Sequence, residues 1–96
     1  MTEVPELTED QLSTAIRSSV RRRLIRGDFR SGEDVKSLRR FIGLSQPRFS
    51  QALGISVHTL RNWEQGRRSP EGPALALLRI AARHPRLILE NLNRAA

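Results

Sequence analysis

One short stretch of the sequence, beginning at Ser56, concentrates side chains that hydrogen-bond in a directed way. If a helix starts there, the face away from the apolar Leu60 and Trp63 carries Val57, His58, Arg61 and Asn62. Asn pairs bidentately with adenine, His donates to guanine, Val contacts a thymine methyl group, and Arg reaches a base or a phosphate. These residue types at helical spacing predict a surface that reads base edges. The alternative is a solvated polar face.

The surrounding sequence predicts the elements that would position these side chains. Residues 45–66 fit two short helices joined by a tight turn. Ser45 and Ser56 are suited to cap the two helices with their hydroxyl oxygens. Pro47 suits a first turn, and Gly54 suits the left-handed conformation that ends a helix. The apolar contacts expected between the helices are Phe49, Leu53, Ile55, Leu60 and Trp63. Such a pair is the helix-turn-helix layout, whose second helix enters a DNA major groove.

Further polar groups near this unit are suited to DNA phosphates. Side chains and backbone N–H groups at a helix start, and guanidinium groups after the second helix, favour anionic oxygens. The predicted phosphate contacts are Ser45, Gln46, Arg48, Thr59, Arg67 and Arg68. For any single Arg the alternative is a solvated charge. Glu64 is expected to hold Arg61 or Arg67 in place, or to form a plain surface ion pair.

The composition favours a nucleic-acid partner over catalysis or metal binding. The 96 residues carry 17 Lys+Arg against 10 Asp+Glu, a net charge of +7, and every basic residue except Lys36 is Arg. There is no cysteine, and the histidines are His58 and His84, so no metal site and no cofactor are expected. No nucleophile–base pair or phosphate-cradling glycine loop is present, so an enzyme is not expected. No apolar run approaches the roughly 20 residues that span a membrane, and the acidic N-terminus is not a signal peptide. A cytoplasmic protein is expected.

The hydrophobic pattern is helical along the whole chain. A capping box at 8–11 and apolar residues spaced by four predict a helix from Glu9 to Arg26. Further helices are expected over 33–42, 74–83 and 85–93, and no strand pattern appears. The expected fold is all-α, with a bundle of four to five helices in a DNA-binding domain at 33–96. An acidic tip and basic helical arm at 1–32 precede it, with 1–7 expected to be disordered.

The predicted arm combines a narrow apolar stripe with a cluster of Arg. The stripe, which packs against one surface only, consists of Leu12, Ile16, Val20 and Leu24. That surface is either the protein's own core or another protein. The basic cluster at 17–26 has three interpretations: a DNA-binding arm, a partner-binding helix or a solvated face. The acidic segment at 3–10 is the better match for a basic partner.

The last expected helix is short and unusually apolar. Its apolar side chains are Leu87, Ile88, Leu89 and Leu92. We expect more apolar surface there than one core needs, so these residues are the predicted dimer surface.

Several of these motifs together resemble the Xre/Cro type of helix-turn-helix protein. The matching segments are 42–46, 53–56 and 62–68, with Phe49, Thr59 and Leu60. The continuation Pro70-x-Gly72-Pro73-Ala74-x-x-Leu77-Leu78, with Ala82-x-His84-Pro85, resembles the HigA and MqsA antitoxins of type II toxin–antitoxin systems. The resemblance covers about Val35 to Leu89.

The resemblance implies a fold and a function. It implies a lambda-repressor-like helix-turn-helix bundle and assigns base reading to His58 and Asn62. It also implies an antitoxin that neutralises a RelE/HigB-like ribonuclease toxin and represses its own operon as a homodimer on palindromic double-stranded DNA. The alternative is a stand-alone Xre-family transcriptional regulator without a toxin.

Overall fold

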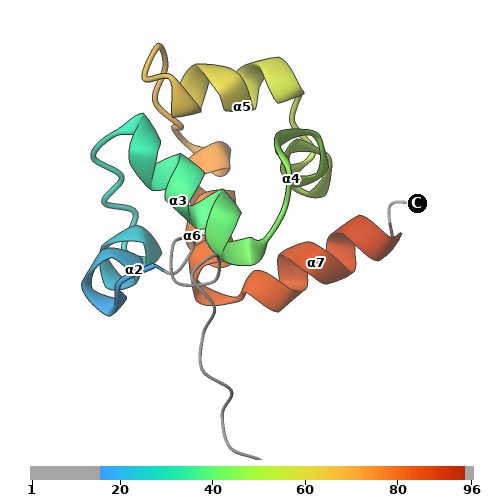
Figure 1. Cartoon of the computed structure of the whole chain (residues 1–96), viewed down its shortest axis with the longest axis horizontal. Helices are drawn as coiled ribbons and strands as arrows, with labels where there is room; N and C mark the ends of the chain where they lie inside the picture. Colours follow the sequence, from blue (N-terminus) through green and yellow to red (C-terminus); the bar gives the residue numbers. More distant parts are fainter. Residues whose placement is uncertain (1–15, 95–96) are drawn as a thin grey trace, which may run out of the picture.

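The computed structural model describes residues 16–94, and each regular element in that range is a helix (Figure 1). The all-α prediction is confirmed for this part of the chain. The elements are α2 (Ser18–Ile25), α3 (Gly32–Ile42), α4 (Gln46–Leu53), α5 (Val57–Glu64), α6 (Pro73–Arg83) and α7 (Pro85–Arg94).

The two helices of the predicted helix-turn-helix unit, α4 and α5, form with the expected local chemistry. Ser45 Oγ accepts from the Arg48 backbone N–H over 3.3 Å, and Ser56 Oγ accepts from the Thr59 N–H over 3.0 Å. Each serine therefore satisfies a donor at a helix start that has no partner within the helix. Gly54 ends α4 at φ 73°, a conformation that L side chains rarely adopt.

The core lies between the six helices of the described residues and is a single apolar cluster. Its most deeply buried large side chains include Phe49, Leu38 and Leu60, from three different helices. Trp63 is also buried, as expected for a core residue. The complete buried apolar set is Leu24, Val35, Leu38, Ile42, Phe49, Ala52, Leu53, Leu60, Trp63, Leu78, Ala81, Ala82, Ile88 and Leu92.

The helix expected from Glu9 to Arg26 is shorter than predicted within the described range. It begins at Ser18, because Arg17 is extended, with φ −66° and ψ 144°, and Ile16 is also non-helical. The expected capping box at 8–11 lies outside the described residues. Apolar spacing therefore identified α2 but misplaced its start.

Helices α3 and α5 approach each other closely at Gly32. An added Cβ there would collide with the backbone carbonyl oxygens of Trp63 and Glu64. Only a residue without a side chain lets the start of α3 lie against the end of α5. This contact connects the helix proposed to read DNA to the rest of the bundle.

A second connection joins α2 to the start of α3 through Arg23 and Asp34. The Arg23 guanidinium donates to both Asp34 carboxylate oxygens, over 3.0 and 3.2 Å, and to the Asp28 carbonyl over 2.7 Å. The Arg30 backbone N–H also donates to Asp34, over 2.8 Å. Burial raises the pKa of the Asp34 carboxyl, but the hydrogen bonds from Arg23 and Arg30 outweigh it and hold that pKa below its usual value.

The lowered pKa of Asp34 predicts a loss of stability in acid. Because the folded state prefers the carboxylate, Asp34 contributes its full stability above the ordinary aspartate pKa of about 3.9. That contribution is lost as the pH falls through the lower pKa of the folded state. Urea unfolding at a series of pH values below about 5 should show this loss in the native protein and a smaller loss in Asp34→Asn.

Asp28→Asn is the matched control for this pH dependence. Asp28 pairs with Arg30 at the surface, where both side chains are well exposed. We therefore expect the acid profile of Asp28→Asn to follow that of the native protein. An unchanged profile in Asp34→Asn would contradict the assignment to Asp34.

Candidate nucleic-acid interface

Helix α5 runs along one edge of the molecule, at the top of Figure 1. His58 and Arg61 are exposed, and Val57 and Asn62 are half-buried. On the opposite face Leu60 is fully buried and Trp63 is 6% exposed. The division of faces predicted from the sequence is thus present in the structure.

A polar hollow separates α5 from the loop that leads into α6. It brings His58 and Asn62, expected to read bases, next to Thr59 and Arg68, expected to bind phosphate. Its full lining is His58, Thr59, Asn62, Trp63, Arg68, Ser69, Glu71 and Ala74. Arg61 does not line it. Sequence reasoning missed Ser69 and Glu71, because they belong to a loop whose approach to α5 no local pattern predicts.

The two hydroxyls among the predicted phosphate contacts each have a hydrogen-bond partner within the protein. Ser45 caps α4, and Thr59 Oγ1 lies 2.9 Å from Ser56 Oγ at the start of α5. Ser45 Oγ accepts in its contact and keeps its own proton for another acceptor, whereas either hydroxyl can be the donor between Thr59 and Ser56. The prediction for these two residues therefore stays open, while Arg48, Arg67 and Arg68 are exposed.

Glu64 has a different partner from those expected. It is buried and pairs with Arg39 of α3, with Arg39 Nε 2.7 Å from Glu64 Oε2 and Arg39 Nη2 3.1 Å from Oε1. The expectation that Glu64 directly contacts Arg61 or Arg67 is therefore wrong. The physical reason is that α3 crosses behind α5 and offers a guanidinium on the buried side.

Gln46, a predicted phosphate contact, lies between the buried ion pair and the surface. Its Nε2 donates to Glu64 Oε1 over 3.2 Å, and its Oε1 accepts from Arg61 Nε over 3.3 Å. Helices α3, α4 and α5 are thus joined by one chain of polar contacts. The chain ends at Arg61, on the exposed face of α5.

Comparison with known proteins places this chain among bacterial antitoxins. The family model described as the antitoxin component of the bacterial toxin-antitoxin system, MqsA, matches residues 3–92. The chain belongs to the MqsA antitoxin family. The resemblance found in the sequence is therefore confirmed at the level of family.

One curated relative of this MqsA-family chain is Antitoxin HigA-2 of Vibrio cholerae serotype O1. The two are 42% identical over 55 residues, which are 57% of this chain and 53% of the relative. The chain thus spans about half the length of this relative. No solved structure matches the MqsA-family chain.

The apolar stripe of the arm packs inward in this MqsA-family chain. Leu24 is fully buried, and Ile16 and Val20 are half-buried against the same core. Leu12 lies outside the described residues. Of the two surfaces considered for the stripe, the protein's own core is the one that Ile16, Val20 and Leu24 contact, and of these three Leu24 is fully covered by it.

Two arginines of the basic cluster also make contacts within the MqsA-family fold. Arg21 Nε donates to the Ala82 carbonyl over 2.9 Å, and its guanidinium lies 5.2 Å from the centre of the Phe41 ring. Arg23 joins Asp34, as described above. In Figure 1, α2 lies at the lower left with α3 between it and α5. This position is away from the proposed reading helix and gives no support to α2 as a DNA-binding arm.

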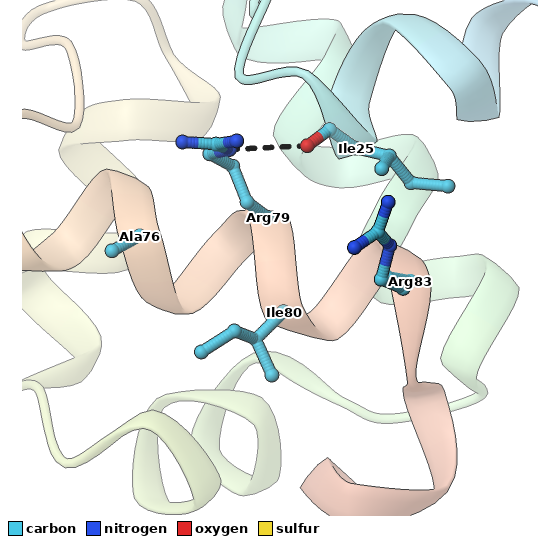
Figure 2. Close-up of a pocket in the computed structure, with 5 residues that line it drawn as sticks. All are labelled: Ile25, Ala76, Arg79, Ile80 and Arg83. Carbon is cyan, nitrogen blue, oxygen red and sulfur yellow. Dashed lines mark hydrogen bonds between the residues drawn. The ribbon is translucent and has the colours of Figure 1, made fainter.

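A shallow hollow lies where α2 packs on α6 (Figure 2). Arg79 reaches across it and donates from Nε to the Ile25 carbonyl over 3.0 Å. The other lining residues are Ala76, Ile80 and Arg83. It contains none of the residues predicted to contact DNA.

The predicted dimer surface is divided by the packing of α7. Ile88 and Leu92 are 5% and 4% exposed and belong to the core, whereas Leu87 and Leu89 are 49% and 37% exposed. The reason is helical geometry: residues 88 and 92 lie one turn apart on the face that packs inward. Of the four predicted residues, Leu87 and Leu89 remain as candidates for dimer contacts.

Residues 16–94 contain neither a membrane-spanning helix nor a metal-binding cluster. No helix in this range has the length and apolar character needed to cross a membrane. No group of His, Asp and Glu side chains in the same range is arranged to hold a metal ion.

Proposed function

We propose that this protein is the antitoxin of a toxin–antitoxin pair and that it binds double-stranded DNA sequence-specifically through α5. The observation that carries the DNA-binding part is the capped, partly exposed helix α5. Its polar side chains point outward, while Leu60 and Trp63 fix it to the core. In helix-turn-helix proteins the second helix enters the major groove in this way.

Membership of the MqsA antitoxin family supports the antitoxin part of the proposal. The partner we propose is a small ribonuclease toxin of the RelE/HigB kind, the class implied by the sequence resemblance. Repression of the operon that encodes both proteins would follow from DNA binding at its promoter. The proposal extends to a homodimer that contacts a palindrome with half-sites about one helical turn apart.

Co-expression with the product of the adjacent gene tests the antitoxin part. We expect the two proteins to co-purify and the growth defect caused by the neighbour alone to be relieved. If the neighbouring product is neither bound nor neutralised while the protein still binds its own promoter, the stand-alone regulator is the better description.

Substitutions on α5 test the reading face. Asn62→Ala and His58→Ala should each cost about 1–3 kcal/mol of binding free energy at the promoter and relax the base preference at one position. Fluorescence anisotropy with promoter duplexes carrying single base changes measures both effects. His84→Ala is the matched control, because His84 is exposed at the end of α6. Unchanged affinity and preference in Asn62→Ala would contradict the assignment.

A further inference from the structure

Arg61 is held against the start of α4 by the side-chain amide of Gln46, and the contact with Glu64 fixes the orientation of that amide. Ionised Glu64 only accepts hydrogen bonds, so the Gln46 side chain must turn its nitrogen toward Glu64. Its carbonyl oxygen then faces Arg61 and accepts from Nε over 3.3 Å. Because the Glu64 side chain is 2% exposed and paired with Arg39, this arrangement is anchored in the protein interior.

The contact through Nε leaves the outer end of the Arg61 guanidinium available. Within residues 16–94, neither of its two terminal nitrogens makes a hydrogen bond, and the side chain is exposed. A guanidinium held by Nε still presents two parallel N–H donors, the geometry that binds two oxygens of one phosphate.

The position of this group differs from that of the other polar residues of α5. His58 and Asn62 line the polar hollow beside α5, whereas Arg61 lies on the side facing α4, bonded to its first residue. In a helix-turn-helix complex the first helix crosses the DNA backbone, and the second reads bases with its N-terminal residues. A side chain that is hydrogen-bonded to the first residue of the first helix is therefore directed at the DNA backbone.

We propose that Arg61 is a phosphate contact positioned by Gln46, and that base reading falls to Val57, His58 and Asn62. This inference rests on the proposed DNA-binding function and changes the role expected for Arg61 from the sequence, where base and phosphate were both open. Glu64 acts indirectly, as the residue that orients the Gln46 amide. Positioning by Gln46 places Arg61 in register without itself specifying a base.

The test compares salt dependence with sequence preference for the full chain. Native protein, Arg61→Ala and Asn62→Ala are each used to select duplexes from a randomised DNA library. Affinity for the duplex that the native protein binds best is then measured over a range of salt concentrations.

We expect Arg61→Ala to select the native sequence, bind all duplexes more weakly by a similar factor, and lose about one unit of the log–log salt slope. Asn62→Ala should instead show a relaxed sequence preference and keep the log–log salt slope of the native protein. Arg86→Ala, an exposed arginine on α7, is the control for loss of charge alone.

A double-mutant cycle tests the positioning by Gln46. Gln46→Ala should weaken DNA binding several-fold in the native background and clearly less in the Arg61→Ala background, because part of its effect acts through Arg61. Additive losses would overturn the positioning role. A relaxed base preference in Arg61→Ala with an unchanged salt slope would overturn the phosphate role. A native protein that selects no sequence would instead overturn the DNA-binding proposal and, with it, this one.

Discussion

Glu64→Ala is expected to lower the free energy of unfolding by about 3–5 kcal/mol, because it leaves the Arg39 guanidinium buried without its counter-charge. The Arg39 side chain is 13% exposed, so water does not readily replace the carboxylate. Its remaining hydrogen bond, from Nη1 to the Leu44 carbonyl over 3.1 Å, satisfies only part of the group. Chemical denaturation monitored by Trp63 fluorescence measures the change.

The double variant Arg39→Met with Glu64→Leu separates the loss of the ion pair from the loss of packing. Replacing both partners by apolar side chains of similar size removes the uncompensated charge, and in other proteins this is often neutral or stabilising. We therefore expect the double variant to recover most of the stability lost in Glu64→Ala. If the double variant is as unstable as Glu64→Ala, the buried charge is not the cause.

Local chemistry made most of the helix-turn-helix unit predictable from the sequence. A capping serine, a first-turn proline and a terminal glycine each act within a few residues, so the bounds of α4 and α5 follow from the residues themselves. The division of α5 into an inner face with Leu60 and an outer face with His58 follows from helical periodicity.

The partners of charged side chains were not predictable in the same way. Glu64 is 25 positions away from Arg39 in the sequence, and nearer arginines were equally plausible partners. Only the crossing of α3 behind α5 selects Arg39. The same limit applies to α7, where four apolar side chains were expected at an interface. The sequence does not show which face of a short helix meets the core, so Ile88 and Leu92 were not separated from Leu87 and Leu89.

Leu24→Ala is expected to cost about 2–5 kcal/mol of unfolding free energy, the range typical of a leucine removed from a packed interior. Leu24 is fully buried in the same cluster as residues of α3 and α6, and α2 packs along α6. If the arm and the domain were independent units, as a boundary at residue 32 implies, the substitution would have little effect on the unfolding of 33–96.

Arg22→Ala on the same helix is the control, because this side chain is exposed and its loss should change stability by less than about 0.5 kcal/mol. Urea unfolding of both variants, followed by Trp63 fluorescence from α5, reports on the domain and not on α2 itself. A shifted midpoint for Leu24→Ala alone would show that α2 completes the core on which the proposed reading helix rests. An unshifted midpoint would support the boundary at residue 32 and leave α2 as a separable arm.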